Sequence, residues 1–384
     1  MRGVICHYHV FLQFVRENFY SMICKLSHCE WAIICPESSF LPEVLTHMFV
    51  PDPIKQTTMG DEAVYNYFPK QIRIAGVGSA GCNVLNYLYS IGAFGAHLIA
   101  IDTDERRLSV IRADEKFLIG QSVIKESGAA GDVEIGRLAA EKSGWKLDES
   151  FRATKLMFLV AGMGGGTGTG AAPVVARIAK EYGAVVVAIV TLPFSDEVEA
   201  RKKAVEGVEK MLDIASTTIV IDFDRLPGYD PEMPKQNAYG IADELIAEKI
   251  KTIVESSTQR PLVHMNLLDL QKLLKEGGLS VMLTCRDRSD DNLLTVIKRA
   301  MDHPLSALDY KEATGALIHV ASGRDMSVEG VIQIVEYIYN KCNPTIRVLY
   351  GARLEKTNDC RIKLLVILTG LRKEQFREKY GGSP

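Results

Sequence analysis

One stretch, residues 155–183, restricts the folds open to this chain more than any other. Residues 155–161 are almost wholly apolar, which is typical of a strand buried on both faces of a parallel sheet. Residues 162–170 contain six glycines and two threonines, and residues 171–182 return to a helical hydrophobic period. Because glycine lacks a Cβ, successive backbone N–H groups can converge there on one small anion where a helix begins. The order of strand, glycine-rich turn and helix therefore predicts a phosphate-binding loop.

A Walker-type P-loop is excluded, because no Lys-Ser or Lys-Thr pair follows these glycines. The alternative is a tight turn that binds no ligand. Two or three glycines suffice for such a turn, and each further glycine adds to the conformational entropy lost on folding. We therefore favour a phosphate site.

Composition narrows the remaining classes of protein. A chain of 384 residues is long enough for two domains. The formal net charge of −3 gives no basic excess, so nucleic acid is not expected as a partner. The longest apolar runs are about ten residues, shorter than a membrane-spanning helix needs. The eight cysteines form no CxxC pair, and such scattered thiols favour a reducing cytoplasm.

A second glycine motif opens a βαβ unit at residues 71–104. Gly76, Gly78 and Gly81 form GxGxxG between a strand and a helix, and Asp102 ends the next strand. Alone, this motif indicates a dinucleotide site, so an NAD- or FAD-dependent oxidoreductase is an alternative. Such an enzyme would not need the later glycine cluster, and no proton-transfer constellation appears near the end of the chain.

The order of predicted elements gives the fold class. Strands alternate with helices up to residue 254, which predicts an α/β fold with a doubly wound parallel sheet. One of these helices, residues 195–215, has an apolar stripe of Val198, Val205, Val208, Met211 and Leu212. A long helix at 237–254 then joins this part to a smaller α/β domain with a mixed sheet. We expect residues 356–359 to join its last two strands as a hairpin-like turn.

At this point the motifs match a known family. GMGGGTGTGAAPVVA resembles the signature of the tubulin/FtsZ superfamily, and GVGSAGCN, GAAGDVEIG and TLPFSDE occur in that family's order. The resemblance covers roughly residues 70–371. The last strands are similar to FtsZ, whereas FLIGQS and LPFSDE are similar to the archaeal CetZ tubulins, so the chain resembles a divergent FtsZ/CetZ-type protein.

This resemblance implies the domain bounds. They are 67–234 for a GTP-binding domain, 235–276 for the central helix and synergy loop, 277–371 for a C-terminal activation domain, and 372–384 for a short tail. Residues 1–66 are interpreted as an N-terminal extension, for which a disordered segment and a family-specific cap both stay open. Met59 is an alternative start of the protein.

The resemblance also implies a site for GTP or GDP, with Mg²⁺ held through the phosphates and no metal held by side chains. Ala130 and Gly131 would face the γ-phosphate. The other phosphate contacts would come from two glycine loops, which contain Gly78, Ser79, Ala80, Gly81 and Asn83 in the first and Gly164, Gly165, Gly166, Thr167 and Gly168 in the second.

The remaining contacts implied by the resemblance concern the ribose and the base. Glu197 and Arg201 match residues that contact ribose and phosphate. Tyr239 matches the aromatic residue that stacks on guanine, and Asp243 the carboxylate that accepts the guanine N1 and N2 hydrogens, which selects GTP over ATP. A core tyrosine and a solvated aspartate are the simpler alternatives. Asp102 and Phe223 both stand where FtsZ has asparagine, so the base pocket is expected to be altered.

The expected catalytic residues lie in the synergy loop. His264, Asn266 and Asp269 align with the Asn-x-Asp-x-x-Asp pattern of FtsZ, whose loop covers the nucleotide of the next subunit. Asp269 keeps the acid, whereas Asn266 can hold a water but cannot take its proton. We expect slow GTP hydrolysis that rises with protein concentration. Alternatively, Asn266 and Asp269 only begin a helix.

The sequence thus predicts a cytoplasmic, GTP-hydrolysing protein that assembles head to tail into cytoskeletal filaments, in cell division or in the control of cell shape. Its main partner would be a second copy of itself, and other FtsZ- or tubulin-like proteins are further candidates. Membrane attachment is expected only indirectly or through residues 372–384. A regulatory homologue that binds GTP with little or no hydrolysis stays an alternative.

Overall fold

The computed structural model describes a single unit of the chain. The described residues are 71–92, 95–124, 128–229, 237–258, 263–287, 293–302, 305, 307–322, 328–343, 345–354 and 362–381. Contacts divide the chain into Met1–Thr58 and Met59–Pro384, and every described residue belongs to the second unit. The expected N-terminal extension and the expected turn at 356–359 lie outside the described residues.

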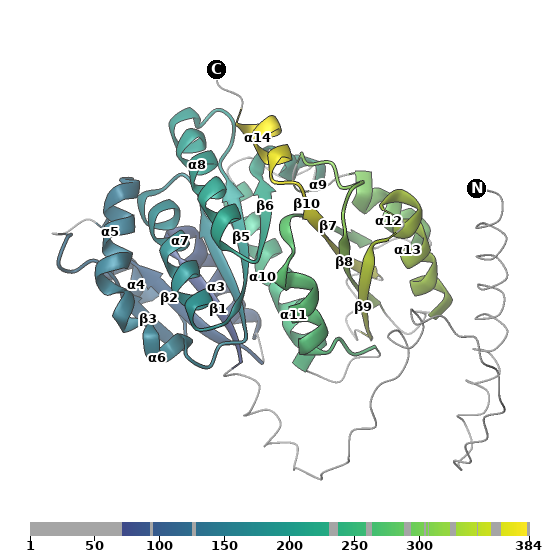
Figure 1. Cartoon of the computed structure of the whole chain (residues 1–384), viewed down its shortest axis with the longest axis horizontal. Helices are drawn as coiled ribbons and strands as arrows, with labels where there is room; N and C mark the ends of the chain where they lie inside the picture. The colour runs from purple at the N-terminus through teal and green to yellow at the C-terminus, as the bar shows by residue number, and fades with distance from the viewer. Residues whose placement is uncertain are drawn as a thin grey trace, which may run out of the picture. The chain divides into compact units, whose positions relative to one another are not determined.

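Six parallel strands form the first part of the sheet, in the order β3-β2-β1-β4-β5-β6 (Figure 1). The strands are β1 Ile72–Val77, β2 His97–Asp102, β3 Glu115–Leu118, β4 Leu156–Gly162, β5 Val185–Leu192 and β6 Thr217–Asp222. β1 and β5 are buried along their whole length, as expected for central strands between two helical layers. The predicted doubly wound α/β fold is confirmed.

Helices cover both faces of these strands. They are α3 Gly78–Ile91, α4 Glu105–Val110, α5 Val133–Ser143, α6 Asp148–Phe151, α7 Gly166–Glu181, α8 Val198–Ile214, α9 Leu226–Tyr229 and α10 Ala238–Thr258, with 3₁₀ turns η2 Gly144–Lys146 and η3 Phe223–Arg225. Because side chains alternate along a strand, each strand feeds two cores. Ala75 and Val77 pack with α5, α7 and α8, whereas Ile72 and Ile74 pack with α3 and α10.

The second part of the sheet is mixed, as predicted. Its strands, in the order β7-β10-β8-β9, are β7 Gly278–Asp287, β8 Gly315–Ser322, β9 Arg347–Leu354 and β10 Ile362–Leu371. The accompanying helices are α11 Leu267–Lys275, α12 Leu293–Asp302, α13 Val328–Lys341 and α14 Glu374–Tyr380. β6 pairs in parallel with β7, from Thr217 opposite Gly278 to Ile219 opposite Ser280, so the two parts share one ten-stranded sheet.

The expected hairpin between the last two strands is wrong. β10 does not pair with β9 but lies between β7 and β8, antiparallel to both, and β9 is the edge strand beside β8. The physical reason is burial on two faces. β10 is apolar almost throughout and is buried along most of its length, which suits a central strand, whereas Tyr350 of β9 is exposed.

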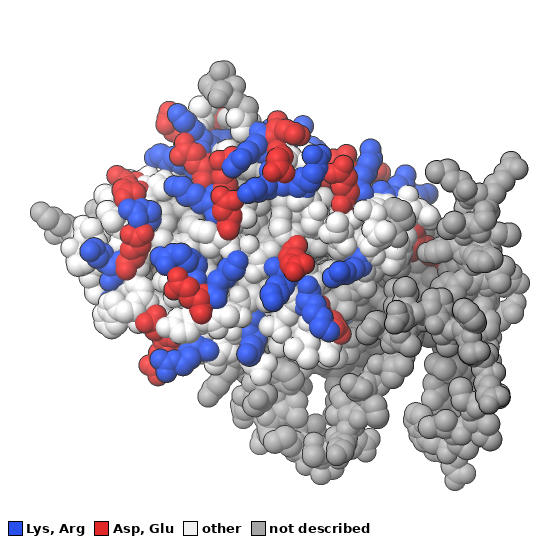
Figure 2. Space-filling model, viewed as in Figure 1, with Lys and Arg blue, Asp and Glu red and all other residues white. Residues whose placement is uncertain are grey.

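The C-terminal helix α14 packs back onto the first part of the molecule. Phe376 is fully buried, and Lys373 and Arg377 form ion pairs with Asp213 and Glu209 of α8. Figure 2 shows positive and negative side chains interspersed over this region. None of the helices in the described part of the chain is both long and apolar enough to cross a membrane.

Candidate functional site

The predicted phosphate loops meet at the carboxyl ends of the parallel strands. β1 lies between β2 and β4, so the order in which successive strands join the sheet reverses there, although all three strands are parallel. Ligands of such sheets bind at the carboxyl ends of the strands beside this reversal. The loops that follow β1, β2 and β4 reach this place, together with residues 128–132 and the segment that follows β5.

The two glycine-rich loops pack directly against each other. A Cβ on Gly78 would lie 2.9 Å from the backbone nitrogen of Gly168, and a Cβ on Gly162 would lie 2.7 Å from Cβ of Ala80. Only bare backbone allows this approach at Gly78, where φ is also 71°. Ser79 beside them is exposed. The first loop therefore lies next to the second.

Helix α7 begins at Gly166, five residues before the predicted start at residue 171. Its N-cap, Gly165, supplies no side-chain hydrogen bond, so the first N–H groups of the helix are not capped by that residue. A Cβ added at Gly165 would meet no atom within 4 Å. Open space in front of uncapped N–H groups is what an anion at a helix N-terminus requires.

Residues 128–131 form the third loop, and their backbone is left-handed at three positions. The φ angles are 61° at Gly128, 47° at Ala130 and 83° at Gly131. Ala130 is the one non-glycine residue with positive φ in the described ranges, a conformation that costs of order 1 kcal/mol. The surrounding structure must hold this loop in place.

Thr103 supplies that hold, and it was not among the predicted residues. Its Oγ1 accepts a hydrogen bond from the Ala129 N–H at 3.0 Å and lies 2.7 Å from Oγ1 of Thr167. Thr103 thus joins the loops after β2 and β4 to residues 128–131. The sequence feature that could have indicated Thr103 is its position directly after Asp102, at the carboxyl end of a strand.

Asp102 is almost fully buried beneath these loops. Its Oδ1 accepts hydrogen bonds from the backbone N–H groups of Thr103 at 2.6 Å and Asp104 at 3.3 Å, whereas Oδ2 has no partner. Burial raises the pKa of Asp102, and those two N–H donors oppose the shift. A buried oxygen without a donor suits a hydroxyl or water that would arrive with a ligand.

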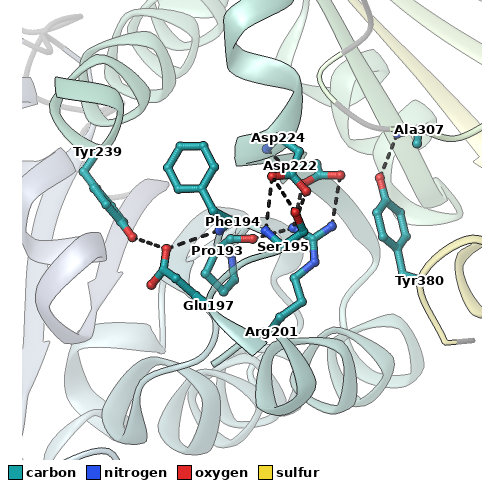
Figure 3. A network of polar contacts seen from close by, with 10 residues as sticks. All are labelled: Pro193, Phe194, Ser195, Glu197, Arg201, Asp222, Asp224, Tyr239, Ala307 and Tyr380. Carbon is teal, nitrogen blue, oxygen red and sulfur yellow. Dashed lines mark hydrogen bonds and ion pairs between the residues drawn. The ribbon is translucent and has the colours of Figure 1, made fainter. Parts of the chain in front are cut away.

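The expected base-binding residues form an aromatic cluster. Tyr239 packs edge-on against Phe223, with ring centroids 5.1 Å apart, and Phe194 completes the group. The Tyr239 hydroxyl donates to Glu197 Oε1 at 2.5 Å (Figure 3). Burial, followed by this bond to Glu197, raises the pKa of Tyr239 to about 12. Tyr239 is 48% exposed, so part of its ring stays open for stacking.

Asp243 and Asn83 were predicted for different parts of the site, and the structure brings them together. The Asn83 side chain hydrogen-bonds the Asp243 carboxylate, which links α3 to α10. Burial raises the pKa of Asp243 to about 7, and the charge of Glu244 adds to the rise, whereas the bond from Asn83 opposes it. The charge of Asp243 therefore changes near neutral pH.

Arg201 lies on the same side of the molecule, but its guanidinium is already engaged. Nη1 and Nη2 donate to the two carboxylate oxygens of Asp222 at 2.8 and 3.2 Å, and Nη1 lies 3.5 Å from Asp224 (Figure 3). Nη1 also donates to the Pro193 carbonyl, and the ring of Tyr380 lies 5.6 Å from the guanidinium carbon. Burial alone would lower the pKa of Arg201, but the carboxylates of Asp222 and Asp224 raise it overall.

Three residues, His264, Asn266 and Asp269, lie at the opposite end of the strands, where the amino ends meet, and all three are exposed. Asn266 is the N-cap of α11, where its Oδ1 accepts from the Leu268 N–H at 3.0 Å. Asp269 in the first turn lies 3.3 Å from Lys272 Nζ. Both residues therefore do begin a helix.

The distance between these residues and the glycine loops follows from β4. Gln271 of α11 donates to the Lys155 carbonyl at 2.8 Å, beside the amino end of β4, whereas the glycine loop leaves the carboxyl end. A strand of seven residues spans about 20 Å. Within one subunit, the expected catalytic residues and the expected phosphate site do not meet, and α11 lies in the lower part of Figure 1, away from α14.

Metal-binding side chains are not grouped in the described residues. None of their His, Cys, Asp and Glu side chains forms a set of three or more that could hold a metal ion.

Comparisons with known proteins agree with this geometry. A family model described as the GTPase domain of the Tubulin/FtsZ family matches residues 71–230, and one described as the C-terminal domain of the FtsZ family matches residues 278–372. The chain is 39% identical over 305 residues to cell division protein FtsZ 2 of Halobacterium salinarum, covering 79% of this chain and 78% of the relative. It is 40% identical to FtsZ 2 of Methanocaldococcus jannaschii, covering 79% and 80%.

Solved structures give the same result. The empty FtsZ dimer of M. jannaschii superposes with a TM-score of 0.75 at 33% identity, covering 81% of this chain and 92% of that one. A GTPγS-bound protofilament of CetZ2 from Haloferax volcanii superposes with a TM-score of 0.70 at 23% identity, covering 81% and 97%, which supports the fold alone.

Proposed function

The chain belongs to the tubulin/FtsZ family, whose members are GTPases, and on that premise we propose that it binds GTP, assembles head to tail and hydrolyses GTP between subunits. The observation that carries the proposal is the separation of the two half-sites. The glycine loops lie at the carboxyl edge of the sheet, and Asp269 lies at the amino edge. Stacking one subunit on the next brings these edges together.

The cradle at the carboxyl edge fits a nucleotide. Gly131 and Gly165 both leave open space where a Cβ would be, and the uncapped start of α7 offers N–H donors to phosphate. Asp243 offers a carboxylate to the guanine N1 and N2 hydrogens, and Tyr239 offers an aromatic face. Mg²⁺ would be held through the phosphates and would neutralise part of their charge.

Hydrolysis is assigned to the exposed end of α11. Asn266 uses its Oδ1 to cap the helix, which leaves its amide hydrogens to hold a water. Asp269 is then the carboxylate that could orient or deprotonate this water, and phosphoryl transfer depends chiefly on such positioning. With one carboxylate in the loop, we expect slow turnover. Leu268, 62% exposed between these residues, offers an apolar contact to the neighbouring subunit.

A second candidate is a regulatory homologue that binds GTP and joins filaments with little or no hydrolysis. The observation in its favour is that Asn266 serves as the N-cap of α11 and that Asp269 pairs with Lys272. Both residues would then be explained by helix formation alone. Phosphate release that stays at background while filaments form would support this candidate.

The test is GTP turnover measured against protein concentration. We expect purified protein to bind guanine nucleotide, and turnover per subunit to rise where filaments appear by electron microscopy. Asp269→Ala should bind GTP as the parent does but lose most turnover. Glu276→Ala, at the other end of α11, is the matched control and should leave turnover unchanged. An Asp269→Ala protein with the turnover of the parent would exclude hydrolysis through this loop.

The cellular setting follows from the same proposal. A second copy of the chain is the main partner, other FtsZ- or tubulin-like proteins are further candidates, and a membrane would be reached only indirectly. Cys82 is a buried thiol outside any disulfide, which suits the cytoplasm. Curated relatives are named as cell division proteins, so division is the first role to test, with control of cell shape as the second.

A further inference from the structure

One face of α8 packs on the glycine loops, and it consists mainly of small residues. Ala200, Ala204 and Gly207 share this face, because they follow the spacing of three, four and seven residues. A Cβ on Gly164 would lie 2.9 Å from the Ala200 carbonyl oxygen, and a Cβ on Gly207 would lie 2.5 Å from Cγ2 of Thr169. The apolar stripe predicted for this helix is confirmed at Val208 and Met211, which are buried. It is wrong at Val198, which is the first residue of α8 and is 68% exposed.

Lys203 is the exception on this face. It lies one turn after Ala200, is only half-exposed, and its Nζ donates to the Gly131 carbonyl at 3.0 Å. The ion pairs of the described part of the chain do not include Lys203, whereas the neighbouring Lys202 is exposed. A long cationic side chain among alanines and glycine, beside a loop expected to face phosphate, needs a reason beyond packing.

The charges expected around the nucleotide supply that reason. Asp102, Glu197 and Asp243 are acidic, and the one predicted cation, Arg201, is engaged by two carboxylates. A triphosphate would thus meet acidic side chains, with backbone N–H groups and Mg²⁺ as its other positive partners. The ammonium of Lys203 has two hydrogens left after its bond to Gly131, and it lies on the loop nearest the expected γ-phosphate.

We propose that Lys203 binds the terminal phosphate of GTP and so distinguishes GTP from GDP. This inference rests on the proposed function, and it adds a binding residue to the same site. The bond to Gly131 holds the ammonium over the left-handed turn at Ala130 and Gly131, whose N–H groups would share the same phosphate. A lysine at this point acts as a single charge that gains a strong partner only when the third phosphate is present.

The experiment compares two nucleotides on nucleotide-free protein below the concentration at which it assembles. Calorimetric titration with GDP and with a non-hydrolysable GTP analogue would give both affinities for the parent, Lys203→Met, Lys203→Arg and the matched control Lys202→Met. For Lys203→Met we expect the affinity for the analogue to fall on the order of tenfold or more, and that for GDP to change less than about twofold. Lys203→Arg should keep part of the preference, and Lys202→Met all of it.

Two other outcomes would overturn the proposal in different ways. If Lys203→Met weakens GDP and the analogue equally, Lys203 only holds the loop through the Gly131 carbonyl, and nucleotide binding itself stands. If the parent binds neither nucleotide, the proposed function fails as well. Thermal unfolding of each variant, with and without GDP, checks that the fold is kept and that a change in affinity belongs to the site.

Discussion

Asp243 has a pKa near neutrality, so its charge can be changed experimentally by a small change in pH. Its carboxyl is half-buried between α3 and α10, and this desolvation raises its pKa to about 7 despite the bond from Asn83. A carboxylate accepts both guanine hydrogens, whereas a protonated carboxyl carries a hydrogen of its own and accepts poorly. For the guanine contact proposed for Asp243, we therefore expect the ionised form to bind.

We predict that GTP affinity falls as the pH is lowered through neutrality. At pH 8 Asp243 is mostly ionised and at pH 6 mostly protonated, so the affinity should fall about tenfold between these values. Equilibrium binding of GTP at pH 6, 7 and 8 measures this. Asp243→Asn, which cannot titrate, should bind weakly at every pH. If the GTP affinity of the parent stays as constant between pH 6 and pH 8 as that of Asp243→Asn, the proposed role of this carboxylate is contradicted.

The sequence was informative about residue types and less so about their partners. Motif spacing predicted the glycine loops, because each follows a strand end, whereas Tyr239 and Asp243 were assigned only through the family resemblance. Thr103, Asp222 and Lys203 were missed, since each acts through a contact with a residue far away in the chain. Periodicity within one element carries no record of such contacts. The assignments of the site residues themselves stay predictions.

At the level of elements, the glycines at the start of α7 have two different functions. A Cβ on Gly170 would overlap the Val133 carbonyl of α5, and a Cβ on Gly166 would lie 2.7 Å from the Asp132 carbonyl oxygen. These two glycines let α5 and α7 pack backbone to backbone. Gly165 has no neighbour to avoid and leaves space for a ligand instead. This division explains why α7 begins inside the glycine run.

We predict that alanine separates these two functions. Gly170→Ala gains helix propensity but forces α5 away, so the free energy of unfolding should fall by more than about 1 kcal/mol net. Gly165→Ala, with an ordinary φ of −87°, should leave that free energy nearly unchanged and lower GTP affinity on the order of tenfold. Denaturant unfolding and nucleotide titration of both variants measure this. Equal effects of the two changes on unfolding would contradict the division.

The C-terminal helix α14 links the two parts of the sheet through Tyr380. The Tyr380 hydroxyl accepts a hydrogen bond from the Ala307 N–H at 2.7 Å and bonds the Asp222 carboxylate, while its ring covers Arg201. In Figure 3 the hydroxyl points toward Ala307, beside the group formed by Arg201, Asp222 and Asp224. By contrast, the Arg377–Glu209 pair of the same helix is exposed.

We predict that the partly buried hydroxyl of Tyr380 and the exposed ion pair of Arg377 differ in their contribution to stability. Tyr380→Phe keeps the ring but leaves the Ala307 N–H and Asp222 short of a partner, which should lower the free energy of unfolding by about 1–2 kcal/mol. Arg377→Met removes a surface ion pair and should cost less than about 1 kcal/mol. Urea unfolding compares the two. A larger loss for Arg377→Met would show that the hydroxyl is not the anchor of this helix.

Element types were easier to predict than strand order. The alternation of strands and helices gave the doubly wound sheet, since burial on both faces leaves a clear apolar signal. The predicted pairing of β9 with β10 was wrong. Residues 356–359 have the composition of a turn, but composition does not say between which strands the chain returns. The pairing of β6 with β7, which joins the two parts of the sheet, was not predicted either. Only three residue pairs form it, and no sequence pattern marks them.

For the whole molecule, the glycine loops and α11 lie at opposite ends of the strands of one sheet, and we propose that each carries half of the site. A contact between different faces of identical subunits gives a ring where the rotation between subunits closes, and an open filament where it does not, as we propose here. Each interface would then take its nucleotide pocket from one subunit and Asp269 from the next. If this holds, a subunit with a defective pocket and one with a defective loop can complement each other.

The last prediction uses this complementation. Asp243→Asn should bind xanthosine triphosphate in place of GTP, because xanthine carries a carbonyl where guanine carries the amino group and a carboxamide can donate to it. Asp269→Ala keeps the GTP pocket but lacks the acid. With both nucleotides present every pocket is filled, and neither variant alone should turn over GTP. An equal mixture should do so, because about half of the GTP-filled pockets would face an intact loop.

Formation of GDP, measured apart from xanthosine diphosphate, is the readout. The control replaces the first variant with Asp243→Asn/Asp269→Ala, which should abolish GDP formation. Mixed filaments that form no GDP would mean that Asp269 does not act on the nucleotide of its neighbour.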